Sequence, residues 1–110
     1  MLYEVTTTDQ DESDLRGIYE YIAFELLSPE NAAGQLDRLE EQIIGLETFP
    51  EKYRIYEKEP WKSRGLRIMA VDNYLVFYIL DKDARIVTIV RVLYDGRDID
   101  NQIMNCTQIY

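Results

Sequence analysis

The sequence predicts a single α+β domain in which a helical hairpin packs on one face of a mostly antiparallel sheet of three to four strands. Residues 66–94 contain three runs rich in β-branched and aromatic residues, separated by only two or three residues typical of turns. Residues 9–48 contain two stretches with apolar residues at helical spacing and a minimal link. Connections this short join antiparallel neighbours, so the strands form a meander and the helices a hairpin that covers it.

The N-terminal part predicts an edge strand followed by the first helix. Residues 2–5 are apolar enough for a short strand, and Thr6–Thr8 offer helix N-caps. Acidic residues then fill the first turns of a helix over 9–27, where negative charge suits the helix dipole. The apolar stripe of this helix comprises Leu15, Ile18, Tyr19, Ile22 and Leu26.

The second helix is predicted over 29–48. Ser28 fits an N-cap and Pro29 the first helical position, while Phe49-Pro50 ends the helix because the residue before proline is pushed out of the helical region. Its stripe comprises Ala32 or Ala33, Leu36, Leu39, Ile43 and Leu46. We expect both stripes to be buried against the sheet and the acidic faces to be exposed.

The meander is punctuated by two turns, Asp72-Asn73 and Asp81-Lys82-Asp83, whose side chains tolerate turn conformations. Both alternating sets of residues are largely apolar in the two later strands, so the sheet is expected to be covered on one face and partly open on the other. Such a face predicts an exposed apolar patch, and self-association when no partner covers it.

The remaining segments carry weaker signals. Residues 51–65 are predicted to be an irregular link, residues 98–103 a short final helix, and residues 104–110 a mobile polar tail of the single domain 1–110. A membrane span and a secretory signal are not visible, and the single Cys106 has no partner for an internal disulfide. We therefore expect a cytoplasmic protein that does not enter a membrane.

Charge is distributed unevenly along the chain. Residues 1–50 carry 12 acids and 2 bases, whereas residues 51–110 carry 9 acids and 10 bases. Six of the bases lie within a basic zone, Lys52–Arg67, which contains two acids. A net charge of −9 opposes non-specific binding to nucleic acid, so any contact with phosphate must be local.

Arginine and tyrosine supply the candidate functional groups. The chain has no histidine, no Gly-rich phosphate loop and no zinc-ligand spacing, so neither a metal nor another cofactor is expected. Arginine offers a planar donor fork for phosphate. Arg91 stands in an otherwise apolar strand, on the face of Val87 and Ile89 by alternation, so it either pairs with a carboxylate such as Glu47 or lines a groove. The full set comprises Arg64, Arg67, Arg91, Tyr94 and Arg97.

The order of these segments resembles the RelE/ParE superfamily, the toxins of type II toxin–antitoxin systems, also known as plasmid stabilisation or addiction modules. The resemblance covers residues 1–103. It rests on the helix Asp14-Leu15-Arg16-Gly17-Ile18-Tyr19-Glu20-Tyr21-Ile22, on Leu46-Glu47-Thr48-Phe49-Pro50-Glu51, on Leu66-Arg67, on Tyr74-Leu75-Val76-Phe77-Tyr78-Ile79, and on Arg91-Val92-Leu93-Tyr94-Asp95-Gly96-Arg97-Asp98.

The resemblance implies a growth-inhibiting toxin that a cognate antitoxin, encoded beside it, holds inactive. RelE-like members cut mRNA on the ribosome without a metal, whereas ParE-like members inhibit DNA gyrase. The Asp-Leu-x-x-Ile-Tyr helix and Phe49-Pro50 are closer to ParE. Three departures from cleaving members agree. Leu75 stands where those members commonly have arginine, and Tyr94 stands where many relatives have histidine. Their lysine-rich strand is replaced here by apolar Leu66 and Ile68, with only Arg67 between them.

We therefore expect a toxin that binds gyrase or another protein. A ribosome-dependent mRNA endonuclease and a non-toxic antitoxin-binding module are the alternatives. For a nuclease, the candidate catalytic residues are Arg67, Arg91, Tyr94 and Arg97, which are expected to converge at one end of the sheet. For the antitoxin, the basic zone suits an acidic or amphipathic segment, and the candidate partner-binding residues are Trp61, Lys62, Arg64 and Arg67.

Overall fold

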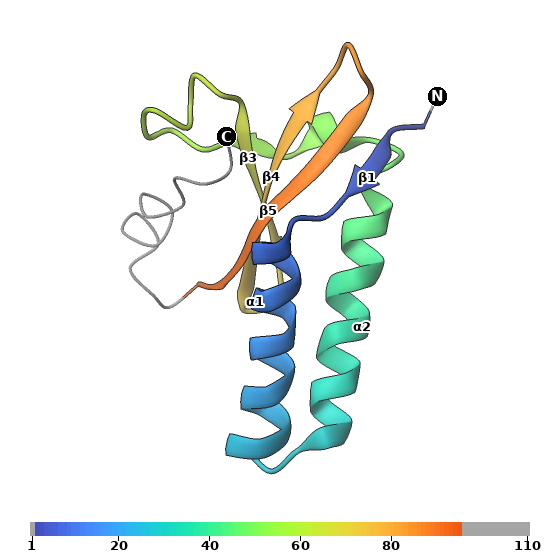
Figure 1. Cartoon of the computed structure of the whole chain (residues 1–110), viewed down its shortest axis with the longest axis vertical. Coiled ribbons are helices and arrows are strands. Elements are labelled where there is room, and N and C mark those ends of the chain that lie inside the picture. The colour runs from blue at the N-terminus through green and yellow to red at the C-terminus, as the bar shows by residue number, and fades with distance from the viewer. Residues whose placement is uncertain (1, 96–110) are drawn as a thin grey trace.

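The computed structural model describes residues 2–95, and within them two long helices cover one face of a five-stranded sheet (Figure 1). The elements are β1 (Glu4–Thr6), α1 (Asp9–Glu20) with a π-helical turn η1 (Tyr21–Glu25), α2 (Pro29–Gly45), a 3-10 turn η2 (Pro50–Lys52), β2 (Arg54–Ile55), β3 (Leu66–Val71), β4 (Tyr74–Asp81) and β5 (Ile86–Tyr94). The predicted final helix, the tail, Cys106 and Arg97 lie outside the described residues. No helix in residues 2–95 is long and apolar enough to span a membrane.

The sheet has the strand order β1-β5-β4-β3-β2. Strands β3, β4 and β5 form the predicted antiparallel meander, and β1 pairs with β5 in parallel, from Glu4 opposite Ile86 to Thr6 opposite Thr88. The predicted link 51–65 also contains the two-residue strand β2, which pairs with β3. The predicted fold class is confirmed, with this short strand as an addition.

The helix-facing side of the sheet forms the larger core. Its apolar centre joins α2 to all three strands of the meander through Leu39, Ile43, Leu46, Met69, Val71, Tyr74, Val76, Tyr78, Val87, Ile89 and Val92. The predicted stripe of the second helix is therefore confirmed at Ala32, Leu39, Ile43 and Leu46, while Leu36 is only half-buried. Tyr78 also donates a hydrogen bond from its hydroxyl to the carbonyl oxygen of Pro50, which fastens η2 to the core.

The predicted stripe of the first helix is wrong at its end. Leu26 is exposed, because the last turn of the helix is π-helical. In this turn the backbone N–H of Leu26 donates to the carbonyl oxygen of Tyr21, five residues earlier. The extra residue in that turn rotates Leu26 away from the sheet. Asp11, an acidic residue that we expected on the outer face, is instead fully buried.

The second face of the sheet is also buried. Tyr56 and Trp61, from the segment before β3, pack with apolar residues of the meander, namely Leu66, Ile68, Leu75, Phe77, Val90 and Leu93. The prediction that this face is partly open is therefore wrong. Exposed large apolar side chains gather instead at the tip of the helical hairpin, where Tyr21, Phe24, Leu26 and Leu27 lie.

A bulge in β5 changes the direction of Arg91. Phe77 lies opposite Arg91, while its neighbour Tyr78 lies opposite Ile89, so Val90 is an extra residue in the strand. After the bulge Val92, rather than Arg91, joins the core that contains Ile89. The prediction that Arg91 shares the face of Val87 and Ile89 is therefore wrong.

Candidate binding groove between the helical hairpin and the sheet

A groove of about 1310 Å³ lies between the helical hairpin and one end of the sheet. Its walls are one flank of α1 with η1, the N-terminal half of α2, the β3–β4 turn and the C-terminal end of β5. The groove therefore depends on how firmly the hairpin is attached to the strands.

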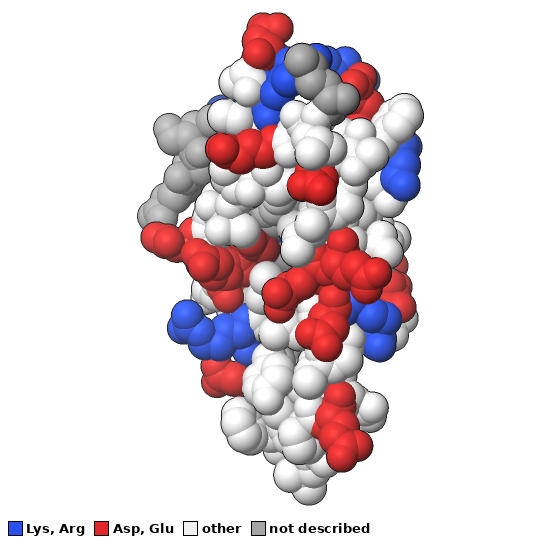
Figure 2. Space-filling model, turned by 90° about the vertical axis from the view of Figure 1, so that its right-hand side faces the viewer, with Lys and Arg blue, Asp and Glu red and all other residues white. Residues whose placement is uncertain are grey.

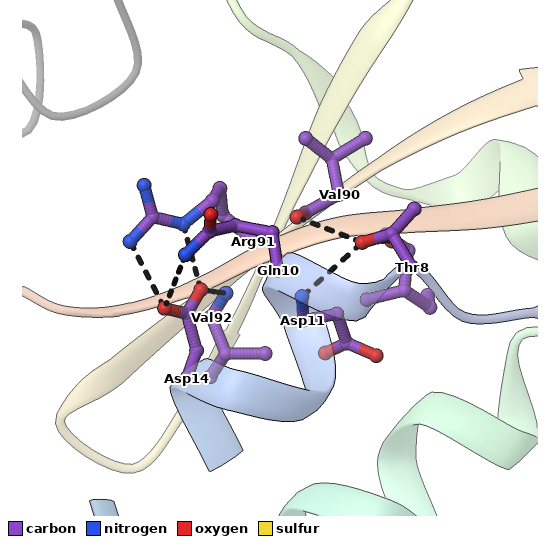
Figure 3. A network of polar contacts seen from close by, with 8 residues as sticks. Thr8, Gln10, Asp11, Asp14, Val90, Arg91 and Val92 are labelled. Atoms are coloured by element: carbon purple, nitrogen blue, oxygen red, sulfur yellow. Dashed lines mark hydrogen bonds and ion pairs between the residues drawn. The ribbon is translucent and has the colours of Figure 1, made fainter. Parts of the chain in front are cut away.

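An ion pair attaches α1 to β5 (Figure 3). Asp14 accepts hydrogen bonds from Nε and Nη2 of Arg91, at 2.7 and 2.9 Å, and from the backbone N–H of Val92 at 3.0 Å. The side chains of Arg91 and Asp14 are only 14% and 10% exposed. The predicted pairing of Arg91 with a carboxylate therefore occurs, but the partner is Asp14 and not Glu47.

The N-terminal end of α1 also supplies a hydrogen-bond partner for the backbone at the edge of β5. Strand β1 pairs with β5 only as far as Thr88, which leaves the following backbone groups at an edge. The hydroxyl of Thr8 donates to the carbonyl of Ile89 at 3.0 Å and accepts from the backbone N–H of Asp11 at 3.1 Å. Thr8 is thus both the N-cap of α1 and a partner of the strand.

A second polar contact attaches α2 to the β3–β4 turn. Asp72, whose φ is +54°, accepts hydrogen bonds from Nε of Arg38 at 2.7 Å and from Nε2 of Gln35 at 2.9 Å. The hydrogen bond from Arg38, followed by that from Gln35, holds the pKa of Asp72 below its ordinary value. The two helices that form walls of the groove are therefore each attached to the sheet through a carboxylate, α1 through Asp14 and α2 through Asp72.

Three tyrosines line the groove, namely Tyr21, Tyr74 and Tyr94. The rings of Tyr74 and Tyr94 meet edge to face, with their centroids 5.8 Å apart. Burial, and then the neighbouring Tyr94 and Tyr21, raises the pKa of Tyr74. Tyr94 itself is half-exposed, so the groove presents aromatic surface to a ligand.

Two helical glycines, Gly17 and Gly34, face the groove from opposite walls. A Cβ at Gly17 would meet nothing within 4 Å, and one at Gly34 would meet only Nη1 of Arg38, at 3.5 Å. Glycine inside a helix costs roughly 0.5–1 kcal/mol relative to alanine. Packing within the described residues does not require glycine at either position.

Asp11 lies one helical turn before Asp14, and its carboxylate points away from the Asp14–Arg91 pair (Figure 3). The side chain is fully buried, and neither carboxylate oxygen has a hydrogen-bond partner within the described part of the chain. Burial, and then repulsion by Asp14 and Glu12, raises the pKa of Asp11 to about 7.

The structure brings together only part of the predicted catalytic set. Arg91 and Tyr94 both line the groove. Arg67 instead lies opposite Tyr78 near the start of β3, and its Nη1 donates to the carbonyl oxygens of Glu51 and Tyr53 at 3.2 and 2.6 Å.

The convergence predicted for Arg67 and Tyr94 is wrong. Tyr94 lies opposite Tyr74, which pairs with the last residue of β3, whereas Arg67 is the second residue of that strand. The two side chains therefore belong to opposite ends of the sheet. The predicted contribution of Arg97 falls outside the described residues.

The predicted partner-binding residues lie away from the groove, in the link before β3 and, for Arg67, at the start of β3 itself. Trp61 is buried, and the guanidinium of Arg64 lies over its ring, 5.3 Å from the centroid. Lys62 and Arg64 are exposed. Of the four predicted residues, these two offer the more accessible surface, and their role stays a prediction.

Sequence reasoning missed Asp14, Gly17, Gly34 and Tyr74 as functional candidates. Glycine within a helical pattern was the available signal, because it has a cost that something must offset. The selection of Asp14 over other acids depends on which turn of α1 reaches β5, which residue spacing alone does not reveal.

The fold is that of a small α+β protein with an open groove between its helical hairpin and its sheet. A family model described as "ParE toxin of type II toxin-antitoxin system, parDE" matches residues 5–99. The chain therefore belongs to the ParE toxin family, and the predicted RelE/ParE resemblance is confirmed. Comparison with curated protein sequences gave no match.

Solved structures show the same fold. The chromosomal ParDE toxin–antitoxin system of P. aeruginosa matches with a TM-score of 0.68 and 19% identity, over 84% of this chain and 95% of that chain. The RelBE2 complex of Mycobacterium tuberculosis matches at 0.61 and 20%, over 86% and 99%. A mutant of E. coli toxin RelE in its free state matches at 0.63 and 9%, over 93% of each chain.

Proposed function

We propose that this toxin inhibits growth by binding a protein target such as DNA gyrase, and that a cognate antitoxin neutralises it by occupying the groove. The observation that carries the first half is the bidentate pairing of Arg91 with Asp14. Cleavage of RNA by basic side chains needs positive charge directed at the scissile phosphate. The strongest candidate for that task is already neutralised by a carboxylate of its own chain.

The rest of the groove supports the same interpretation. Arg38, the other arginine of its lining, forms an ion pair with Asp72, and Glu30 adds a negative charge. A phosphate that displaced Asp14 from Arg91 would leave that carboxylate buried without its cation, which is costly. Phosphate recognition in this groove is therefore disfavoured.

Protein recognition is favoured by the lining of the groove. Tyrosine and arginine are the residue types enriched where protein interfaces have their strongest contacts. Gly17 and Gly34 leave space on both walls, so the backbone of an inserted segment can approach the helices closely. This arrangement fits a helix or an extended segment of an antitoxin.

The target is tested by inducing the chain alone in cells and with purified enzyme. We expect growth to stop while mRNA stays intact, and supercoiling by purified gyrase to be inhibited. Ribosome-dependent cleavage of mRNA, with supercoiling unaffected, would instead establish the nuclease. That second candidate is favoured by the likeness of fold to RelE and by the half-exposed Tyr94 in the groove.

The antitoxin site is tested with a glycine substitution. A Cβ at position 34 makes only an ordinary contact with Nη1 of Arg38, at 3.5 Å, and the position lines the groove. The side chain of Gly34→Gln should therefore occupy groove space and weaken binding to the protein encoded by the adjacent gene at least about tenfold. Gly45→Gln is the matched control, because Gly45 belongs to the same helix, has open space around it and does not line the groove. Equal binding by both variants would place the antitoxin elsewhere, with the basic zone as the next candidate.

A further inference from the structure

The tip of the helical hairpin exposes four large apolar side chains in a short stretch. Tyr21, Phe24, Leu26 and Leu27 are 56%, 67%, 56% and 83% exposed. The tip extends beyond the sheet at the lower end of the molecule (Figure 1). The face in Figure 2 shows uncharged surface at that end with acidic side chains on it. Contiguous exposed apolar surface of this kind marks interaction sites in soluble proteins.

The backbone of the tip is unusual in the same place. Leu27 has φ +52°, a left-handed conformation that costs a residue with a Cβ roughly 1–2 kcal/mol. The preceding turn is π-helical, a form that occurs frequently at functional sites. Leu27 is thus strained and almost fully exposed, and neither property contributes to the stability of the fold.

Charge around the tip restricts what can dock there. Residues 17–37 contain four acids, Glu20, Glu25, Glu30 and Asp37, and no lysine or arginine. Nucleic acid and anionic membrane surfaces are repelled by such a field. A second copy of the chain would place acids against acids, which is unfavourable. The complementary partner is a protein surface with apolar side chains surrounded by lysine and arginine.

We propose that the hairpin tip, through its exposed side chains Phe24 and Leu27 and the exposed acids Glu20 and Glu25 of the same segment, docks a protein partner that presents apolar side chains within a basic rim. Phe24 and Leu27 do not line the groove, so this surface is distinct from the one assigned to the antitoxin. This proposal rests on the proposed function: the partner is the protein target that the toxin binds to inhibit growth. The toxin then contacts its target and its antitoxin through different surfaces.

Direct binding tests the proposal without relying on toxicity. The probe is a fluorescent amphipathic peptide of leucine and lysine, about 18 residues or five helical turns long, and its comparison replaces every lysine with glutamate. Phe24→Ser/Leu27→Asn is the test variant, because asparagine tolerates the left-handed conformation. Ile44→Ser/Phe49→Ser is the matched control, since these residues are 59% and 61% exposed at the opposite end of the hairpin.

We expect the lysine peptide to bind the wild type, the test variant to weaken that binding at least about tenfold, and the control variant to change it less than about twofold. The glutamate peptide should bind at least about tenfold more weakly than the lysine peptide. Equal binding by wild type and test variant, equal loss in both variants, or equal binding of the two peptides would overturn the proposal. So would a wild-type dimer, measured by sedimentation, that the test variant abolishes.

Growth measurements separate this proposal from the function on which it rests. Phe24→Ser/Leu27→Asn should lose growth inhibition and still co-purify with the protein encoded by the adjacent gene. Full growth inhibition by that variant would overturn the docking surface alone. A wild type that does not inhibit growth would overturn the proposed function, and the peptide measurement would still decide the docking surface.

Discussion

Asp14 and Arg91 are 77 residues apart in the sequence and form a buried bidentate ion pair that joins α1 to β5. The same carboxylate also accepts from the backbone N–H of Val92. One side chain thus satisfies three donors of β5, at the point where β1 has stopped pairing with that strand. This pair both shapes the wall of the groove and neutralises the arginine within it.

Removal of Asp14 should destabilise the protein strongly. Asp14→Ala leaves a buried guanidinium without its carboxylate, so we expect a loss of about 3–5 kcal/mol in the free energy of unfolding, measured in urea. Asp14→Asn should lose less, because its amide oxygen still accepts from Val92. Glu40→Ala, which removes an exposed acid of α2, should change stability by less than about 0.5 kcal/mol. A comparable small change in Asp14→Ala would show that the pair contributes little.

Asp11 should make the protein less stable as pH rises. Burial raises the pKa of Asp11 to about 7 in the folded protein from its ordinary value of 3.8, so between these two pH values the folded state holds a proton that the unfolded state has lost. The contribution of Asp11 to the free energy of unfolding should therefore be largest below about pH 4. It should decline as the pH rises to about 7, by a few kcal/mol at most. Asp11→Asn should remove this decline, measured by urea unfolding from pH 4 to 8.

The neighbouring Asp9 supplies the comparison for that experiment. It is exposed in the same first turn of α1, so Asp9→Asn should leave the slope of stability against pH between 4 and 7 unchanged. A constant difference between Asp11→Asn and the wild type over the whole range would mean that Asp11 does not titrate there.

Leu27→Gly should stabilise the protein although it removes a large side chain. Glycine adopts φ +52° without strain, so the gain of roughly 1–2 kcal/mol outweighs the greater entropy of the unfolded chain, leaving about 0.5–1 kcal/mol. Leu26→Gly is the contrast, since Leu26 has φ −93° and substitution there should only destabilise. The melting temperatures of the two variants should therefore move in opposite directions. A loss of stability in both would indicate that Leu27 packs more tightly than its exposure indicates.

Tyr78→Phe should cost about 1–2 kcal/mol of unfolding free energy. The substitution removes the hydrogen bond to the carbonyl of Pro50 and leaves that oxygen without this donor in a buried site. Burial also raises the pKa of Tyr78 above its ordinary value, so the loss should stay constant from pH 6 to 9. Tyr19→Phe, at a half-buried tyrosine of α1, should change the urea midpoint much less. Equal midpoints for Tyr78→Phe and the wild type would contradict the assigned bond.

Local patterns predicted most of the architecture. Alternation with tight turns identified the meander, and the spacing of Leu39, Ile43 and Leu46 identified the buried face of the second helix. Features that depend on tertiary packing escaped such reasoning. The π-helical turn and the bulge at Val90 each insert one residue into a regular period, and both change the direction of the side chains that follow.

The candidate site was less predictable than the fold. That Arg91 pairs with a carboxylate follows from the cost of burying an unpaired charge, but the choice of Asp14 depends on how α1 lies along β5. Arg67 and Tyr94 were grouped by residue type, whereas the strand register separates them. The exposed position of Leu26 at the hairpin tip also escaped prediction, because a regular helix would have buried this residue with the rest of its stripe.

The parallel pairing of β1 with β5 sets the order in which a newly synthesised chain reaches its final form. Thr6 meets Thr88 only after a further 82 residues have been made. At roughly 5–20 residues per second, this wait lasts about 4–16 seconds on the ribosome. The residues of the helical hairpin are synthesised well before those of β5. The wall of the groove that β5 forms is therefore added late. A nascent toxin is therefore unable to offer the finished groove to an antitoxin until β5, residues 86–94, has been made.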